Sequence, residues 1–134
     1  MMKSTKTKFV REYPINASAK LLYPYLTTAS GLAQWFCDDV NIGAGKVYNF
    51  LWDGRNHFAE LTNLRSNRSV RFLFVNREGE HPEDPSYVDF TIESSELTQE
   101  LFLKVIDYSE EDDEEELEEL WENLIHKLRE IVGG

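Results

Sequence analysis

The sequence predicts an α+β fold in which a curved antiparallel sheet of about seven strands wraps around one long C-terminal helix. From Lys46 to Tyr108, short segments alternate apolar and polar residues, the two-residue period of strands. In the last quarter of the chain, apolar residues recur at steps of three and four, the period of one helix face. That face must be covered, and the preceding strands are the available cover. Its residues are Leu117, Leu120, Trp121, Leu124, Ile125, Leu128, Ile131 and Val132.

The N-terminal region predicts one strand followed by two short helices. Residues 8–15 alternate as a first strand. Ser18 is a candidate N-cap for a helix over residues 19–26, and Pro24 should shorten or kink that helix. A second short helix fits residues 30–36, with its first serine as the cap.

The middle of the chain predicts an antiparallel meander, because short polar turns separate its strands. Asp53 and Gly54 form a standard hairpin signal. The glycines at 43 and 45 indicate another hairpin turn and not a phosphate loop, since the lysine and the following helix of such a loop are missing. Strands are expected over residues 46–52, 57–65, 70–76, 87–94 and 97–108. Their clearest inward faces are Val70, Phe72 and Phe74, then Val88, Phe90 and Ile92, then Leu101, Leu103 and Val105.

Length and composition are those of one globular domain over residues 1–134, with residues 1–7 expected to be disordered. Cys37 is the only cysteine, so an intrachain disulfide is excluded and a reducing cytoplasm fits best. No signal peptide is visible, and no segment approaches the roughly 20 apolar residues that span a bilayer. We therefore expect a cytoplasmic protein without a membrane span.

The net charge of −11 is concentrated in one place, because nine of the ten residues at 110–119 are acidic. A protein with this charge would repel phosphate backbones, so a nucleic-acid partner is not expected. The acidic run can serve as a solvated helix start, where carboxylates complement the helix dipole. It can also act as a docking surface for a basic protein partner.

The order of these elements resembles the helix-grip fold of the START-like superfamily, and more narrowly the branch related to activators of the heat-shock chaperone ATPase. The resemblance rests on the segments at 13–36, 48–54 and 120–132, and on Trp121 near the start of the last helix. The segment QWFCDDVNI at 34–42 is similar to START-like proteins of Bacteroidetes. These motifs are structural and carry no catalytic residues.

The resemblance implies a cavity between the long helix, the sheet and the two short helices, in which many members hold hydrophobic molecules. The alternative is that the same side chains fill a core, since aromatic residues at inward positions pack densely in any domain. The residues expected to line the cavity are Trp35, Phe36, Tyr48, Phe50, Trp52, Phe72, Phe74, Phe90, Ile92, Trp121, Leu124 and Leu128.

Catalytic and metal-binding patterns are weak in this sequence. The three histidines are far apart, and none stands at metal-ligand spacing, so no metal and no cofactor are expected. Asp38 and Asp39 form a local carboxylate pair that fits a turn better than a cation site. His57 and Glu60 would indicate acid–base chemistry only if they formed a buried pair.

We therefore expect a non-catalytic module that binds a small hydrophobic ligand by burial. A protein-interaction module of the chaperone-activator type, using the acidic surface, is the alternative. An enzyme of the kind found elsewhere in the superfamily is a weaker third hypothesis. The oligomeric state and the identity of any ligand are left open by the sequence.

Overall fold

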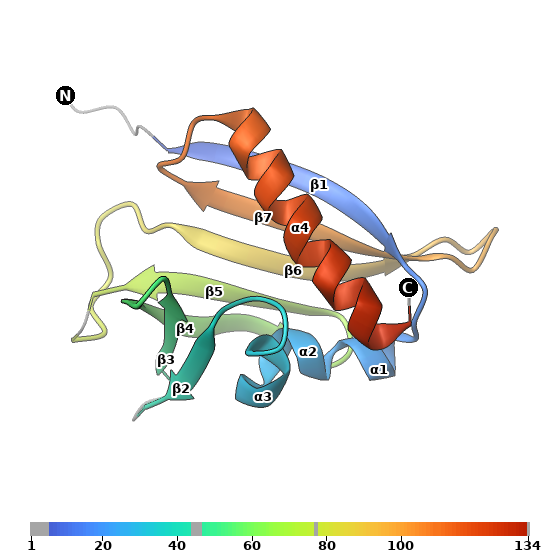
Figure 1. The fold of residues 1–134 in the computed structure, drawn as a ribbon, viewed down its shortest axis with the longest axis horizontal. Helices are drawn as coiled ribbons and strands as arrows, with labels where there is room; N and C mark the ends of the chain where they lie inside the picture. Colours follow the sequence, from blue (N-terminus) through green and yellow to red (C-terminus); the bar gives the residue numbers. More distant parts are fainter. Residues whose placement is uncertain (1–5, 44–46, 77, 134) are drawn as a thin grey trace.

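The computed structural model describes residues 6–43, 47–76 and 78–133 (Figure 1). The strands are β1 (Thr7–Ile15), β2 (Asp39–Ile42), β3 (Val47–Trp52), β4 (Arg55–Arg65), β5 (Ser69–Val75), β6 (Tyr87–Ser94) and β7 (Leu101–Ser109). The helices are α1 (Ala19–Leu22), α2 (Pro24–Thr27), α3 (Ala29–Leu32) and α4 (Glu114–Val132). This is the predicted α+β order. Residues 1–5 of the segment expected to be disordered lie outside the described residues, and β1 begins at Thr7.

One seven-stranded antiparallel sheet forms the body of the fold, in the order β1-β7-β6-β5-β4-β3-β2. The sheet is curved and does not close, since β1 and β2 lie at opposite edges. Helix α4 lies across the face formed by β1, β7 and β6, and the short helices lie below it, with α3 beside β2 (Figure 1). The prediction of a sheet that covers a long C-terminal helix is confirmed.

The turns explain most of the strand register. Asp53 and Gly54 both have positive φ, 51° and 74°, as the predicted two-residue hairpin between β3 and β4 requires. The turn expected at 43–45 falls partly on residues outside the described ones. Strand β2 was not predicted from the residue pattern, because four residues are too few to show a period. The last strand begins four residues later than expected, and Leu97 lies in the preceding turn with 96% of its surface exposed.

Three short helices stand where two were predicted. Helix α1 ends at Leu22, and Pro24 begins α2, so the predicted helix over 19–26 is broken just before this proline. Ser18 caps α1 as expected, by accepting a hydrogen bond from the backbone N–H of Leu21. The cap of α3 is Thr28 and not Ser30, because the Thr28 hydroxyl accepts from the N–H of Gly31 at 3.0 Å.

Helix α4 contacts β1 through polar side chains near both of its ends. At its start, the Arg11 guanidinium lies 2.8 Å from a carboxylate oxygen of Glu114. At its end, Nε of Arg129 donates to the carbonyl oxygen of Pro14 at 3.0 Å. Asp113 caps the helix N-terminus, and Gly133, with φ of 112°, ends the helix in the left-handed region. These contacts hold the helix along the sheet.

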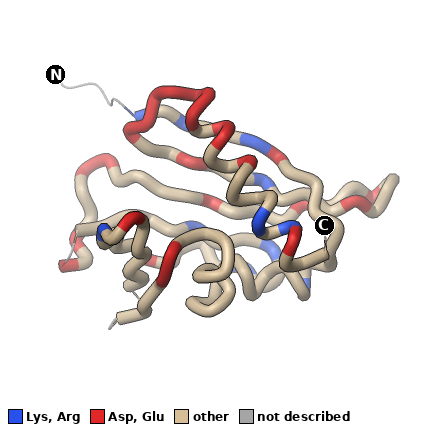
Figure 2. Tube along the Cα trace, in the orientation of Figure 1, with Lys and Arg blue, Asp and Glu red and all other residues tan. Residues whose placement is uncertain are grey.

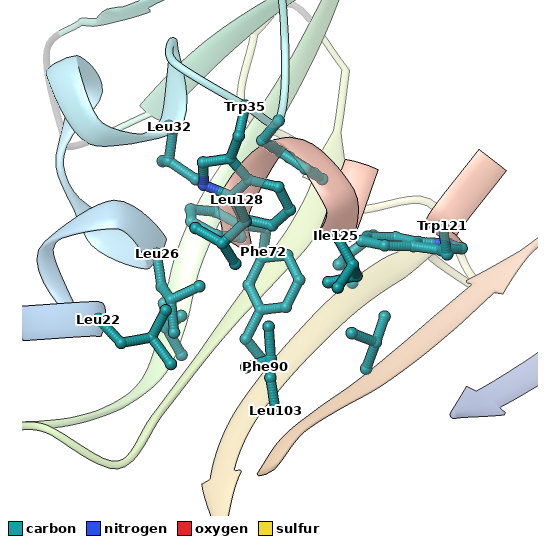
Figure 3. Close-up of a cluster of buried hydrophobic side chains, with 14 of the residues drawn as sticks. Leu22, Leu26, Leu32, Trp35, Phe72, Phe90, Leu103, Trp121, Ile125 and Leu128 are labelled. Atoms are coloured by element: carbon teal, nitrogen blue, oxygen red, sulfur yellow. The ribbon is translucent and has the colours of Figure 1, made fainter. Parts of the chain in front are cut away.

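The core lies between α4, the short helices and the concave face of the sheet. Figure 3 shows Leu22 and Leu26 from the short helices facing Phe72, Phe90 and Leu103 from the sheet, with Ile125 and Leu128 of α4 closing the cluster. All seven side chains have 0% of their surface exposed. The inward faces predicted for β5, β6 and β7 are confirmed, although Phe74 and Leu101 at their ends are only partly buried.

Candidate functional site

Phe36 fills the centre of the space between α4 and the sheet. Its ring centroid lies 5.3 Å from that of Phe50, 5.6 Å from that of Phe90 and 6.0 Å from that of Trp121. Only 2% of its surface is exposed. Aromatic rings at these separations make favourable offset and edge contacts. The deep part of the fold is therefore packed with side chains.

Two indole hydrogen bonds fix the segment 33–38 that carries Phe36. Nε1 of Trp35 donates to the carbonyl oxygen of Tyr25 at 2.7 Å. Nε1 of Trp52 donates to the carbonyl oxygen of Phe36 itself, also at 2.7 Å. The segment is thus held to α2 on one side and to β3 on the other, which gives Phe36 a defined position.

An open cleft of about 940 Å³ lies beside Phe36, between residues 117–127 of α4, the segment 33–38 and the ends of several strands. We call it the α4 cleft. Its apolar lining consists of Ala33, Trp35, Phe36, Trp52, Phe58, Phe74, Val75, Val88, Leu117, Leu120, Trp121 and Leu124. Its other lining residues are Gln34, Cys37, Asp38, Asp53, Asn56, His57, Asn76, Ser86, Asp107, Ser109, Glu111 and Lys127.

The twelve residues expected to line a cavity divide into two groups of six. Those in the α4 cleft are Trp35, Phe36, Trp52, Phe74, Trp121 and Leu124. The others lie in the core beneath it and do not line it; they are Tyr48, Phe50, Phe72, Phe90, Ile92 and Leu128. All six residues of the second group have 9% or less of their surface exposed. Three residues of the first group, Trp35, Phe36 and Trp121, are equally buried and form the floor of the cleft.

The walls of the cleft are partly solvent-exposed apolar side chains. Leu120 has 49% of its surface exposed, although it belongs to the apolar face of α4. Opposite it, Trp52 contacts Phe74 with a centroid separation of 6.4 Å and His57 with one of 4.9 Å. These side chains offer apolar area that the protein itself does not cover.

Asp107 brings a buried carboxylate to this cleft. It lies on β7 opposite Phe9 of β1 and Val88 of β6, and 8% of its surface is exposed. Its Oδ2 accepts a hydrogen bond from Nε1 of Trp121 at 2.8 Å. Burial raises the pKa of Asp107, against the opposing effect of hydrogen bonds from Trp121 and Ser109.

Asp107 was missed by the sequence reasoning, although a signal for it existed. The alternation predicts Leu101, Leu103 and Val105 as the inward positions of this strand, and the same alternation continues to residue 107. A carboxylate at a position that the pattern marks as inward is unusual, because a buried charge is costly. Continuing the alternation by one step would have found it.

The polar candidates named from the sequence make structural contacts. Oδ2 of Asp38 accepts from the backbone N–H of Asp53, and Oδ1 of Asp39 accepts from that of Val40. Glu60 lies 3.0 Å from Nε2 of His81 and does not form the pair with His57 that acid–base chemistry would need. In the described parts of the chain, no three His, Cys, Asp or Glu side chains are grouped to hold a metal ion.

The acidic run forms a second candidate surface at the start of α4. Figure 2 shows acidic residues gathered on the loop before α4 and on its first turns. Residues 110–116 are all exposed. Arg11 approaches Glu114 and Glu118, while Asp113 is used as the N-cap. Mutual repulsion raises the pKa of Glu116, with Asp113 and then Glu111 as the largest contributors.

Comparison with known proteins links this geometry to one family. The model of the START-like superfamily domain matches residues 2–134. A solved structure of a protein from Bacteroides fragilis is 31% identical, with a TM-score of 0.61 and a match that covers 96% of this chain and 93% of that one.

More distant structures share the fold. The Aha1 dimer from Colwellia psychrerythraea is 22% identical, with a TM-score of 0.74 over 94% of this chain and 96% of that one. A protein from Bacillus halodurans is 17% identical, with a TM-score of 0.70 over 94% of this chain and 96% of that one.

The comparison with curated proteins found no match. Among the described residues, no helix combines the length and the apolar character needed to span a membrane.

Proposed function

This chain belongs to the START-like superfamily, and we propose that it is a single non-catalytic binding domain that holds a small hydrophobic molecule in the α4 cleft. The observation that carries the proposal is the cleft itself. Its volume of about 940 Å³ lies within the range of roughly 300–1,000 Å³ typical of small-molecule sites. Half of its lining residues are apolar, and several of these are aromatic.

The proposed ligand position is shallower than the one first expected. Phe36 occupies the deep space between helix and sheet, so the ligand would lie against Phe36 and not beneath it. Its cover would come from Leu120 and Leu124 on one side and from Trp52 and Phe74 on the other. Burying this apolar area is worth about 25 cal/mol for each Å² removed from water.

Titration with a neutral fluorescent dye, N-phenyl-1-naphthylamine, tests this proposal. We expect saturable binding of one dye per chain and a change in tryptophan fluorescence, because Trp52 lines the cleft. Leu124→Trp should obstruct the cleft beside Phe36 and weaken binding. Leu21→Trp is the matched control, since Leu21 lies on α1 outside the cleft with 49% of its surface exposed. Absence of saturable binding to the wild-type protein would refute the proposal.

The acidic surface supports a second candidate function, a protein-interaction module of the chaperone-activator type. Support comes from the exposure of residues 110–116 and from the structural likeness to Aha1, which was solved as a dimer. A dense negative patch accelerates association with basic partners and makes it sensitive to salt. Replacing Glu114, Glu115 and Glu116 with Gln should abolish such an association in pull-downs at low salt. If the triple variant retains the same salt-sensitive partners, the acidic surface is not the docking site.

The single cysteine supports a further proposal about cellular location. We place the protein in the cytoplasm, because its one cysteine cannot form an intrachain disulfide and its fold depends on none. Burial, and then the nearby Asp39 and Asp38, raise the pKa of Cys37 to about 12, so its thiol stays protonated and poorly reactive at neutral pH. Fractionation of the native host is the direct check.

A further inference from the structure

The three tryptophans satisfy their indole N–H groups in two different ways. Trp35 and Trp52 each donate to a backbone carbonyl oxygen at 2.7 Å. Trp121 instead donates to the carboxylate of Asp107 at 2.8 Å. A neutral acceptor is therefore sufficient for an indole in this fold, and anchoring Trp121 does not by itself require an ionisable carboxyl group at residue 107.

The charge of Asp107 is not balanced by the protein. In the sheet, Asp107 is paired with Phe9 of β1 and Val88 of β6, and both of these residues have 6% or less of their surface exposed. Among the described residues, none of the ion pairs includes Asp107, and the charged side chain that affects its pKa is Glu111, another carboxylate. Burying a carboxylate without a cation is costly. A purely apolar ligand that displaced water from Asp107 would increase this cost. A cationic group that enters with a ligand would offset the cost.

The α4 cleft gives such a group access and a favourable field. Asp107 lines the cleft next to Trp121. The charged residues that line the cleft are four acids, Asp38, Asp53, Asp107 and Glu111, against one lysine, Lys127. Low-dielectric walls with one dominant sign of charge concentrate ligands of the opposite sign. This lining would repel a fatty-acid carboxylate and attract an ammonium group.

We propose that the hydrophobic ligand of the α4 cleft carries a protonated amine, and that this amine pairs with the carboxylate of Asp107. This inference rests on the proposed function, since the apolar part of the ligand would occupy the cleft described above. The apolar body of the ligand lies against Phe36, Leu120 and Leu124. Its amine reaches the Asp107 side chain on β7, beside Trp121. The ligand class is therefore an amphiphilic amine and not a fatty acid.

Three ligands of equal chain length separate this inference from the proposed function. Decylamine, 1-decanol and decanoate are titrated by calorimetry into the intact protein at neutral pH and moderate salt, below the concentrations at which they aggregate. A charge-assisted hydrogen bond should make decylamine bind about tenfold or more tightly than 1-decanol. Decanoate should bind most weakly of the three.

Two isosteric variants test whether Asp107 is responsible for the preference for decylamine over 1-decanol. Asp107→Asn keeps an oxygen acceptor for Trp121 but removes the charge, so the advantage of decylamine over 1-decanol should fall to about threefold or less. Asp53→Asn removes one charge at an exposed position of the same cleft, and the preference for the amine should persist. Asn is suited to the positive φ of residue 53.

A measurement on the wild-type protein covers the case in which Asp107→Asn fails to fold. The carboxyl carbon resonance of Asp107 should move on saturation with decylamine and stay in place with 1-decanol. Saturable 1-decanol binding without an amine preference, or a preference unchanged in Asp107→Asn, would overturn the inference and leave the proposed function standing. If none of the three ligands saturates, the proposed function itself fails.

Discussion

Trp121 and Asp107 form a buried hydrogen bond that joins α4 to β7. The indole Nε1 donates to Oδ2 of the carboxylate at 2.8 Å, and the exposed fractions are 2% and 8%. The bond lies next to the α4 cleft, so the same pair anchors the long helix and shapes the proposed site. Stability and binding should therefore respond together to changes at these two residues.

Truncating Trp121 should cost far more stability than truncating its more exposed neighbour Leu120. Trp121→Ala removes a fully buried aromatic side chain and is expected to lower the free energy of unfolding by about 3–5 kcal/mol. Leu120→Ala is the control, because Leu120 has 49% of its surface exposed and should lose less than about 1 kcal/mol. Urea unfolding measures both. A loss below about 1 kcal/mol for Trp121→Ala would show that the helix does not pack as described.

Asp107 should make stability depend on pH in a defined direction. Burial raises its pKa above the ordinary value of 3.8, so the folded protein holds this proton more tightly than the unfolded chain. Its stabilising contribution is then complete at acidic pH and is lost as the pH rises through the raised pKa. Asp107→Asn cannot titrate, so its stability relative to wild type should improve as the pH rises through the raised pKa of Asp107.

Unfolding of the wild-type protein and of Asp107→Asn in urea at several pH values measures this difference in stability.

Trp121→Phe provides a second test, because the hydrogen bond from Trp121 lowers the pKa of Asp107. Loss of that bond should raise the pKa further and carry the pH-dependent interval upward. A stability difference between Asp107→Asn and wild type that is constant with pH would contradict the burial of this carboxylate.

The acidic run should contain one residue that matters for folding among several that do not. Asp113 accepts hydrogen bonds from the backbone N–H groups of Glu115 and Glu116 at 3.1 and 3.2 Å. Removing the cap with Asp113→Ala should cost about 1 kcal/mol. Glu115→Gln removes a nearby exposed charge and should change the unfolding free energy by less than about 0.5 kcal/mol. Equal effects in thermal or urea unfolding would argue against the assigned helix start.

Gly31 should tolerate no side chain. A Cβ at this position would lie 2.7 Å from Cα of Tyr25 and would also meet the carbonyl oxygen of Pro24. Both atoms belong to the backbone of α2, so α3 would have to move, and Gly31→Ala should destabilise the protein by about 1–3 kcal/mol. Ser30→Ala, at the exposed neighbouring position, is the control. A stable Gly31→Ala protein would show that α2 and α3 are less closely packed than described.

Most of the fold could be predicted because periodic patterns determine which face of an element is buried. The strand containing Phe72 and the helix containing Trp121 each show such a pattern, and both were placed correctly. Strand β2 could not be predicted in this way, since four residues are held mainly by pairing with β3. The cap of α3 was misplaced because Thr28 and Ser30 have equivalent capping chemistry, and backbone geometry decides between them.

The site was harder to predict than the fold. Alternation shows that Phe50 and Trp52 are on the same side of a strand, but not that Phe36 contacts both of them while only Trp52 lines the cleft. That difference depends on how the segment 33–38 crosses the sheet, and Trp52 fixes this segment through a hydrogen bond distant in sequence. Depth within the cavity is a tertiary property, so six of the twelve candidate residues lie beneath the cleft and not in it.

The most direct test of the central claim is to locate a bound ligand by nuclear Overhauser effects between unlabelled 1-decanol and the methyl groups of isotope-labelled protein. If the α4 cleft is the binding site, cross-peaks should connect the alkyl chain to the methyl groups of Leu120 and Leu124. Leu22 and Leu26, which lie in the filled core, should show none. Cross-peaks to Leu22 or Leu26 without any to Leu120 and Leu124, or the absence of intermolecular cross-peaks at saturating 1-decanol, would contradict the account.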